Sequence, residues 1–350
     1  MRRRDIIPET RSVSYLTLSE EFILKSKILR FGVIGSNFVA DWFCDTVKNT
    51  DGAVLAAVCS RTDERGHAFA EKHGIPAVFT DMEAFLSSDI DAVYIASPNI
   101  CHFPQAMDAV RRGKHVLAEK PACLNEAQFL TLLGAAEENG VTVLEAMRPG
   151  HDPAIERARE AMGKIGTVRR AVFDFCQYSS RYDRYKKGEI LNAFNPALGN
   201  AALMDIGVYA VHCCVMLFGR PESVYAKSVI LPNGMEGMGT AFFTYPGMQA
   251  EITWSKITDS ASPSVILGEG GAVLLGKLST VESVTLVPRG GEAEDVTGER
   301  PENNMVYELA DFLAAVRGEA DPAPWQENTA LTPTLMDETR RQNGIAFPGE

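Results

Sequence analysis

The sequence predicts an α/β protein, with an N-terminal doubly wound parallel sheet followed by a C-terminal α+β domain with an open, mostly antiparallel sheet. Over residues 28–148, apolar runs typical of buried strands alternate with helix-like segments, as in a parallel sheet covered by helices on both faces. Over residues 166–287, β-like runs follow one another across short turns, which favours antiparallel pairing. A chain of 350 residues is long enough for both units. We expect domains at 28–148 and 149–350, after an N-terminal extension at 1–27.

Composition argues against several classes of protein. Hydrophobic residues make up 45% of the chain and charged residues 23%, which is typical of a globular protein with a sizeable core. The net charge of -12 argues against binding to nucleic acid or to an anionic membrane. No apolar run is expected to reach the length of a membrane span. The seven cysteines lack C-x-x-C spacing, which favours reduced thiols in a cytoplasmic protein without a metal site.

The N-terminal extension begins with arginines at positions 2–4, but no apolar stretch long enough for an export signal follows them. We therefore interpret residues 1–27 as a tail, as an over-extended start, or as an arm that packs on a partner subunit.

The first strand and its turn are typical of dinucleotide-binding folds. An apolar run at 28–34 is followed by Gly35, Ser36 and Asn37 and then by a helix. This arrangement places backbone N–H groups and the positive helix end against a pyrophosphate. Gly35 and Ala40 fit the G-x-G-x-x-G/A pattern, whereas Asn37 replaces the middle glycine and is expected to tolerate left-handed backbone angles. On this segment alone, an ordinary strand–turn–helix is the alternative.

The end of the second strand, at 53–59, indicates which dinucleotide binds. NAD-preferring folds carry an acid near this point, which bonds the ribose 2′-hydroxyl. Here Ser60 and Arg61 follow the strand, and a guanidinium can bind a 2′-phosphate in a bidentate way. The sequence therefore favours NADP(H). The alternative is NAD(H), with Arg61 stacked on the adenine of either cofactor.

The remaining strands of the first domain are expected at 77–79, 91–96, 116–118 and 141–144, with helices at 63–73, 82–86, 102–112 and 126–138. Ligands of such sheets bind at the carboxyl ends of the strands. Those ends carry the polar segments 35–38, 60–61, 97–99, 119–121 and 145–148.

The second half contains one segment with a chemical pattern. A helix is expected over 195–212, with Asp205, Tyr209 and His212 on one face. For His212 alone, a buried hydrogen-bonded side chain is the favoured interpretation. Trp254 is interpreted either as a substrate contact or as sheet core, and the charged stretch 181–189 as a solvated loop. The other elements are helices at 152–162, 302–316 and 327–342 and strands at 166–178, 223–231, 240–244, 248–254, 264–267, 272–275 and 281–287.

Several of these segments together resemble the glucose–fructose oxidoreductase/inositol dehydrogenase/rhizopine-catabolism (Gfo/Idh/MocA) family. The resemblance rests on segments 35–40, 60–61, 96–99 with His102, and 337–348, and above all on 113–121, which ends in Glu119-Lys120-Pro121. It implies a Rossmann domain, terminal helices that return to it, and a homodimer or homotetramer paired through the C-terminal sheet. The candidate cofactor-binding residues are Gly35, Ser36, Asn37, Phe38, Ser60, Arg61, Ser97, Pro98, Asn99, His102, Glu119 and Lys120.

The resemblance also implies a catalytic set of Lys120, Asp205 and Tyr209. Tyr209 is the expected general acid/base, and Lys120 is expected to lower its pKa and to bond the substrate oxygen. Asp205 would orient the substrate or Lys120, and Glu119 would lie near the nicotinamide ribose. Tyr209 stands where inositol dehydrogenases carry His, so the chain looks closer to the dihydrodiol dehydrogenases, and this difference argues against inositol as substrate. The Lys120–Pro121 bond is expected to be cis, as in relatives.

Substrate contacts are predicted at Lys120, Arg148, Asp205 and Tyr209. The predicted function is hydride transfer between a nicotinamide cofactor and a carbinol or carbonyl carbon of a sugar, polyol or cyclic diol. The alternatives are an NAD(H)-preferring dehydrogenase of the same fold and a non-catalytic NADP(H)-binding redox sensor.

Overall fold

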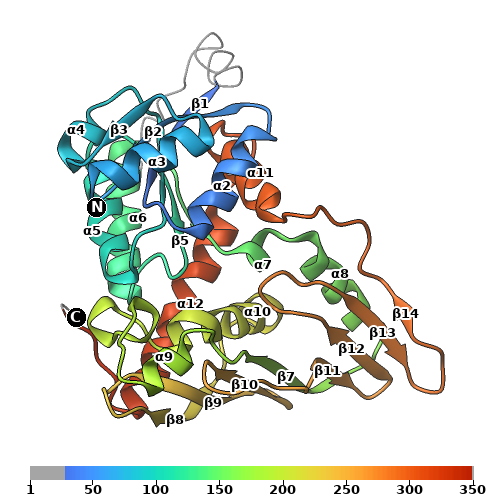
Figure 1. Cartoon of the computed structure of the whole chain (residues 1–350). Helices are drawn as coiled ribbons and strands as arrows, with labels where there is room; N and C mark the ends of the chain where they lie inside the picture. The colour runs from blue at the N-terminus through green and yellow to red at the C-terminus, as the bar shows by residue number, and fades with distance from the viewer. Residues whose placement is uncertain (1–27, 349–350) are drawn as a thin grey trace, which may run out of the picture.

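The computed structural model describes residues 28–348, so the predictions for residues 1–27 lie outside the described part of the chain. These residues form two sheets with their covering helices, and the segments that carry the predicted site residues lie between the two sheets (Figure 1).

The first sheet is parallel and has six strands in the order β3-β2-β1-β4-β5-β6. Strand order reverses beside β1, which is the doubly wound arrangement that the sequence predicted. Its strands are β1 (Leu29–Ile34), β2 (Ala53–Cys59), β3 (Ala77–Phe79), β4 (Ala92–Ile95), β5 (His115–Glu119) and β6 (Val143–Ala146). Its helices are α2 (Phe38–Lys48), α3 (Asp63–His73), α4 (Met82–Leu86), α5 (Asn99–Arg111) and α6 (Glu126–Asn139).

Two helix starts differ from the expectation. Helix α5 begins at Asn99, three residues before the expected start at His102, with Pro98 at the N-cap position. A short helix, α7 (Arg148–His151), follows β6. Both helices begin shortly after a strand ends. Helix boundaries depend on cap geometry, which a sequence pattern does not reveal.

The second sheet has eight strands in the order β14-β13-β12-β11-β7-β10-β9-β8. Its central pair, β7 and β10, is parallel and the other pairs are antiparallel, so the predicted mostly antiparallel sheet is confirmed. The strands are β7 (Val168–Cys176), β8 (Ser223–Ile230), β9 (Glu236–Tyr245), β10 (Met248–Ser255), β11 (Ser264–Gly268), β12 (Gly271–Leu275), β13 (Val284–Pro288) and β14 (Glu294–Asp295).

Helices α8 (Pro153–Met162), α10 (Val208–Phe218) and α12 (Ala323–Gln342) cover one face of this sheet (Figure 1). The other face carries exposed apolar side chains. Tyr225 on β8 and Phe242 on β9 lie directly opposite one another and are 60% and 42% exposed.

Helices α11 (Met305–Val316) and α12 return to the first sheet. The ring of Phe312 in α11 lies 5.7 Å from that of Phe31 in β1. In α12, Gln326 donates to the Val143 carbonyl at 3.0 Å, and Gln342 donates to the Val224 carbonyl at 2.8 Å. The helix is therefore bonded to β6 of one sheet and to β8 of the other.

The segment Pro196–Phe218 has 23 residues, and its most apolar 18-residue window has a mean hydropathy of 1.8, so by length and composition it could cross a membrane. The expectation that no run would do so is wrong. In the structure 78% of its most apolar window is buried inside the protein, because α10 packs between the second sheet and α12. Its apolar character is that of a core helix.

Candidate active site

A cavity of about 1290 Å³ runs from the carboxyl ends of the first sheet to the helix-covered face of the second. The glycine turn, the ends of β2, β4 and β5, and residues 175–209 all contribute to its lining. Every candidate cofactor, substrate and catalytic residue predicted from the sequence lines it.

The turn after β1 is shaped by Gly35, whose φ is +107°. A Cβ at this position would lie 2.7 Å from the Ala96 carbonyl oxygen, so only glycine fits. Asn37 has φ -103° and ψ 178°, so it does not use the left-handed backbone conformation that asparagine tolerates. Asn37 instead caps α2, because its Oδ1 accepts from the N–H groups of Val39 and Ala40 at 3.0 Å.

The end of β2 presents two guanidinium groups to the cavity. Arg61 follows the buried Ser60, and Arg65 lies one helical turn later in α3. Sequence reasoning missed Arg65, although the spacing of four residues from Arg61 would have placed it on the same side of a helix.

The segment after β4 is fixed to neighbouring loops. Ser97 donates to Gln105 at 2.6 Å, and Asn99 donates to the Gly199 carbonyl at 3.1 Å. His102 is buried, and its ring nitrogens contact the carbonyls of Ser97 and Pro121 at 2.7 and 2.8 Å. The imidazole of His102 therefore ties the Ser97 segment to the segment that carries Lys120.

Glu119 belongs to a buried acidic group. The Tyr94 hydroxyl donates to Glu119, and burial raises the pKa of the Glu119 carboxyl. Glu308 of α11 lies behind it, fully buried, and neither of its oxygens has a hydrogen-bond partner within residues 28–348. Burial, with Glu119 nearby, raises the pKa of Glu308 well above its ordinary value.

Lys120, Asp205 and Tyr209 lie together although Lys120 follows β5 of the first sheet, whereas Asp205 and Tyr209 belong to the helical segment 203–218. The Lys120 ammonium donates to the Asp205 backbone carbonyl at 2.7 Å and to its Oδ1 at 3.3 Å. It also lies 4.9 Å from the centre of the Tyr209 ring. The Lys120–Pro121 peptide bond is cis.

Asp205 lies in a π-helical turn, η3 (Leu203–Gly207), at the start of α10. The expected helix therefore has a wider turn where the sequence predicted catalytic residues, with the Val208 N–H bonded to the Leu203 carbonyl. Such turns are frequent at functional sites because they redirect backbone groups. Here the Asp205 carbonyl accepts from Lys120.

Burial and the neighbouring charges set the pKa values of Lys120, Asp205 and Tyr209. Burial alone would raise the pKa of Asp205, but Lys120 and Lys256 hold it well below its ordinary value. Burial alone would lower the pKa of Lys120, but the acidic groups of Tyr209, Asp205 and Glu119 around it raise this pKa instead. Burial raises the pKa of Tyr209, and the opposing effect of Lys120 is smaller. Lys120 therefore acts on the Tyr209 pKa in the expected direction, but burial outweighs it, so the pKa is raised overall and the phenol is protonated at neutral pH.

Lys256 is a residue of this site that the sequence analysis missed. It follows β10 and donates to Asp205 Oδ2 at 2.5 Å and to the Ala193 carbonyl at 2.8 Å. A lysine after a strand occurs widely, so no pattern in the sequence distinguishes it.

Glu236 in β9 and Trp254 in β10 hold the π-helical turn η3 from the side of the second sheet. Glu236 is fully buried, and it accepts from the Leu203 N–H and from the Trp254 indole N–H, both at 2.7 Å. Trp254 is also fully buried. Of the two interpretations of Trp254, the structure therefore favours sheet core and not a substrate contact. A Cβ on Gly207 would lie 2.8 Å from the Trp254 ring, so the helix approaches the ring closely only because glycine is present.

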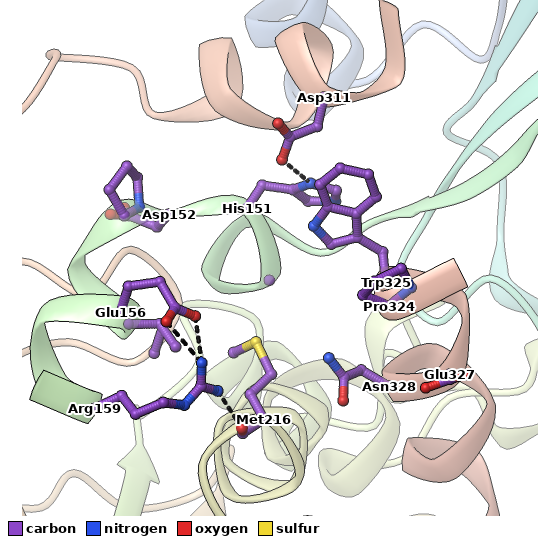
Figure 2. Close-up of a pocket in the computed structure, with 13 residues that line it drawn as sticks. His151, Asp152, Glu156, Arg159, Met216, Asp311, Pro324, Trp325, Glu327 and Asn328 are labelled. Carbon is purple, nitrogen blue, oxygen red and sulfur yellow. Dashed lines mark hydrogen bonds and ion pairs between the residues drawn. The ribbon is translucent and has the colours of Figure 1, made fainter. Parts of the chain in front are cut away.

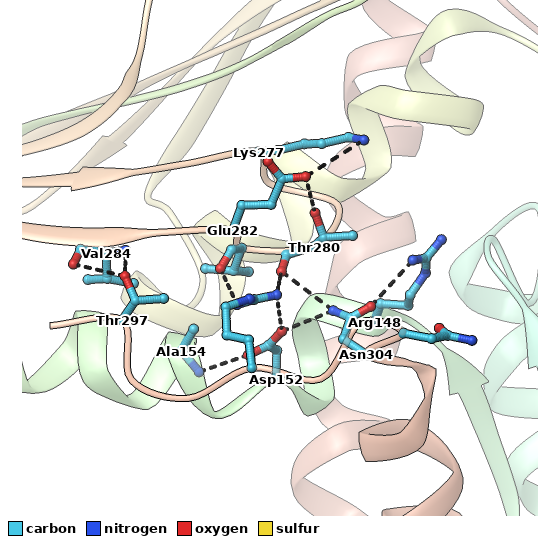
Figure 3. A network of polar contacts seen from close by, with 12 residues as sticks. Arg148, Asp152, Ala154, Lys277, Thr280, Glu282, Val284, Thr297 and Asn304 are labelled. Carbon is cyan, nitrogen blue, oxygen red and sulfur yellow. Dashed lines mark hydrogen bonds and ion pairs between the residues drawn. The ribbon is translucent and has the colours of Figure 1, made fainter. Parts of the chain in front are cut away.

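Arg148 is held at the edge of the cavity by a polar network, shown in Figure 3. Its guanidinium donates to Asn304 at 3.3 Å and lies 5.1 Å from the Trp42 ring. Asn304 in turn donates to Asp152 at 2.9 Å, and Arg300 pairs with the same carboxylate. Arg148 is thus fixed in orientation before any ligand binds.

Of the other side chains weighed, His212 is buried and contacts the Thr332 hydroxyl at 3.0 Å, as the sequence analysis favoured. Residues 182–186 form a helical turn, α9 (Tyr182–Lys186), where a loop was expected. The seven cysteines are all free.

A second, smaller cavity of about 470 Å³ lies where α7, α8, α11 and α12 meet. Figure 2 shows its side chains paired with one another: His151 contacts Asp311 at 2.8 Å, and Arg159 bonds Glu156. None of the predicted site residues lines it.

Two family models match the chain. The model of the Gfo/Idh/MocA oxidoreductase family with an NAD-binding Rossmann fold matches residues 29–147, and that of the Gfo/Idh/MocA C-terminal domain matches residues 156–274.

Similar proteins match nearly the whole chain. A scyllo-inositol 2-dehydrogenase (NADP(+)) of Bacillus subtilis is 39% identical, covering 92% of this chain and 99% of the relative. A trans-1,2-dihydrobenzene-1,2-diol dehydrogenase of Mus musculus is 27% identical over 91% of this chain and 98% of the relative. The crystal structure of a 3-ketoreductase from Actinomadura kijaniata with NADP and TDP-benzene superposes with a TM-score of 0.79 at 24% identity, covering 91% and 99% of the two chains.

Proposed function

The chain belongs to the Gfo/Idh/MocA oxidoreductase family, and within it we propose an NADP(H)-dependent dehydrogenase or reductase that acts on a sugar, polyol or cyclic diol. The observation that carries this proposal is that Lys120, from the end of β5, meets Asp205 and Tyr209, from the helical segment 203–218, beside one cavity that begins at the glycine turn. A protein that only senses a nucleotide needs no such group.

The glycine turn and the end of β2 fit NADP(H). Gly35 allows the close backbone approach that a pyrophosphate requires. Arg61 and Arg65 supply two cations where an NAD-preferring site carries an acid. The Bacillus subtilis relative is named as NADP(+)-dependent, which supports the same preference. The residues that would hold the cofactor are those predicted above, with Arg65 added.

Tyr209 is the proposed general acid/base. The nicotinamide, when bound, supplies or accepts the hydride. Because burial keeps the Tyr209 phenol protonated at neutral pH, it donates its proton to the substrate carbonyl oxygen in the reduction direction. In the oxidation direction Tyr209 must first lose that proton, and the Lys120 ammonium beside its ring stabilises the phenolate.

Asp205 holds Lys120. Its backbone carbonyl and Oδ1 both accept from the Lys120 ammonium, so of the two roles considered for Asp205 we propose the orientation of Lys120. The lysine keeps its charge in the cavity, where it stabilises negative charge on the substrate oxygen.

The substrate half of the cavity suits a polyhydroxylated molecule. Its uncharged polar side chains are Gln177, Ser179, Ser180, Asn192 and Asn200, and they offer both donors and acceptors to hydroxyl groups. Cyclic polyols stay in the proposed substrate class, because the Bacillus subtilis relative is named for scyllo-inositol. That name speaks against the sequence-based argument that Tyr209 disfavours inositol.

Steady-state assays test this function. Purified protein is mixed with NADP⁺ or NAD⁺ and a panel of scyllo-inositol, glucose, xylose and a cyclic trans-diol, and nicotinamide absorbance is followed. We expect turnover of at least one polyol with a preference for NADP⁺. Tight NADPH binding without turnover of any panel member, in either direction, would favour the redox sensor instead.

The exposed face of the second sheet supports a homodimer or homotetramer. Tyr225 and Phe242 form an exposed apolar pair on the sheet face opposite the helices. We propose that this face forms the contact between subunits of a cytoplasmic enzyme. We also propose that the boundary between the two domains lies between residues 148 and 149. Light scattering checks the assembly: the wild type is expected to be at least dimeric and Tyr225→Asp smaller, whereas a monomeric wild type would contradict the proposal.

A further inference from the structure

We propose that Lys256 is a positioning residue of the reaction centre: it fixes the Asp205 carboxylate so that Asp205 in turn holds Lys120 beside Tyr209. This inference rests on the proposed function and adds a residue to it.

The two lysines share one carboxylate. Lys256 donates to Asp205 Oδ2 at 2.5 Å, and Lys120 donates to Oδ1 at 3.3 Å. The Lys256 bond is the shorter one, and the Lys256 side chain is 4% exposed, compared with 14% for Lys120. A carboxylate bonded through one oxygen can still rotate about its side-chain bonds. Bonding at both oxygens removes that freedom and leaves Oδ1 directed at Lys120.

The same ammonium connects the reaction centre to the wall of the substrate cavity. Lys256 donates to the Ala193 carbonyl at 2.8 Å and lies 5.1 Å from the ring of the buried Phe194. The neighbouring residues Asn192 and Asn200 line the substrate half of the cavity. Through Lys256, the position of this wall and that of the Asp205 carboxylate are therefore coupled.

Charge balance gives Lys256 a second effect on Tyr209. The Asp205 carboxylate raises the pKa of the Tyr209 phenol, and Lys256 balances part of that negative charge. Without Lys256, Asp205 and Lys120 form a neutral pair. The Tyr209 phenolate then loses a stabilising charge, so oxidation requires a higher pH. An ion pair that only stabilised the fold would not change this pH dependence.

The test compares Lys256→Met, Lys256→Gln and Lys256→Arg, with Lys164→Met as a control at an exposed lysine outside the cavity. We expect Met and Gln to lower kcat about 100-fold, as a small misplacement of catalytic groups does, with NADPH affinity measured by fluorescence unchanged. The alkaline limb of the oxidation rate should move to higher pH. Arg keeps the charge and the donors, so it is expected to restore most of kcat.

Each outcome decides between the alternatives. If wild type turns over substrate and both neutral variants keep wild-type kcat and pH profile, Lys256 has no positioning role. A loss of kcat with an unshifted pH profile and no rescue by Arg contradicts the proposal equally, because it indicates a structural effect alone. If wild type itself shows no turnover with any polyol, the proposed function fails instead. Lys256→Gln can still bond Ala193 and is the variant to compare if Lys256→Met does not fold.

Discussion

The Lys120 ammonium lies 4.9 Å from the centre of the Tyr209 ring, over its face. The Lys120 ammonium donates hydrogen bonds to Asp205, and it acts on the phenol through its charge.

Lys120→Met removes the charge that stabilises the Tyr209 phenolate and the substrate oxyanion. We expect kcat to fall about 10³-fold, because no other described cation lies over the Tyr209 ring. NADPH affinity, measured by fluorescence, should change little, since the glycine turn and Arg61 are untouched. Turnover at the wild-type rate would remove Lys120 from the mechanism.

Tyr209 gives the two reaction directions opposite pH dependences. Because burial raises its pKa, the protonated form needed for reduction is present at neutral pH and is lost only as pH rises through the raised value. The oxidation rate should increase over the same interval. Tyr209→Phe should lower both rates about 10²- to 10⁴-fold and abolish both limbs. An unaltered pH–rate profile would exclude Tyr209 from proton transfer.

Arg61 and Arg65 are predicted to select the 2′-phosphate. The double variant Arg61→Ala/Arg65→Ala should raise KM for NADPH about 10- to 100-fold, because a charge-assisted bond to phosphate contributes about 1.5–3 kcal/mol. KM for NADH should change by less than about threefold, since NADH carries no phosphate at this position. An equal loss for the two cofactors would show that the arginines contact a part that they share.

Glu145 is predicted to reduce stability at alkaline pH. Burial raises its pKa to about 7, while an unfolded chain has the ordinary value near 4.5. The folded protein thus binds the extra proton between these values, and stability falls as pH rises through that window. Glu145→Gln should therefore raise the free energy of unfolding by about 2–3 kcal/mol at pH 8 and by much less at pH 4.5. Urea unfolding at the two pH values measures the difference.

Gly207→Ala is predicted to disturb the π-helical turn η3. The new methyl group would lie 2.8 Å from the buried Trp254 ring, and Glu236 holds that ring in place. We expect a loss of about 1–3 kcal/mol in stability together with reduced kcat. Gly134→Ala is the matched control, because it lies in α6 with open space around its Cβ position and should be neutral or slightly stabilising. Equal effects of the two variants would contradict the steric explanation.

Regular periodicity explains why the fold could be predicted from the sequence. Runs such as 92–95 are apolar on both faces and are bounded by turns, and this pattern is specific to buried parallel strands. The carboxyl ends of those strands lie at one edge of the sheet. The residues that follow them, Lys120 and Arg61 among them, could therefore be predicted as site residues.

The misses have a different physical origin. Lys256 meets Asp205 through the pairing of β7 with β10 and the 3-10 turn at Asn192–Phe194, and no local sequence pattern predicts such a contact. The π turn depends on tertiary bonds from Glu236 and Lys120. The raised pKa of Tyr209 follows from how completely the fold buries it, and burial is a property of the assembled protein.

The return of α11 to the first sheet limits how this enzyme can be divided. Phe312 fills the core beneath β1, so a fragment that stops near residue 148 would expose that apolar surface to water. We therefore expect residues 28–148 expressed alone to aggregate, and a fragment that also carries 303–316 through a short linker to be the smallest soluble unit. Any dissection, domain exchange or chimera built from this chain must move α11 together with residues 28–148.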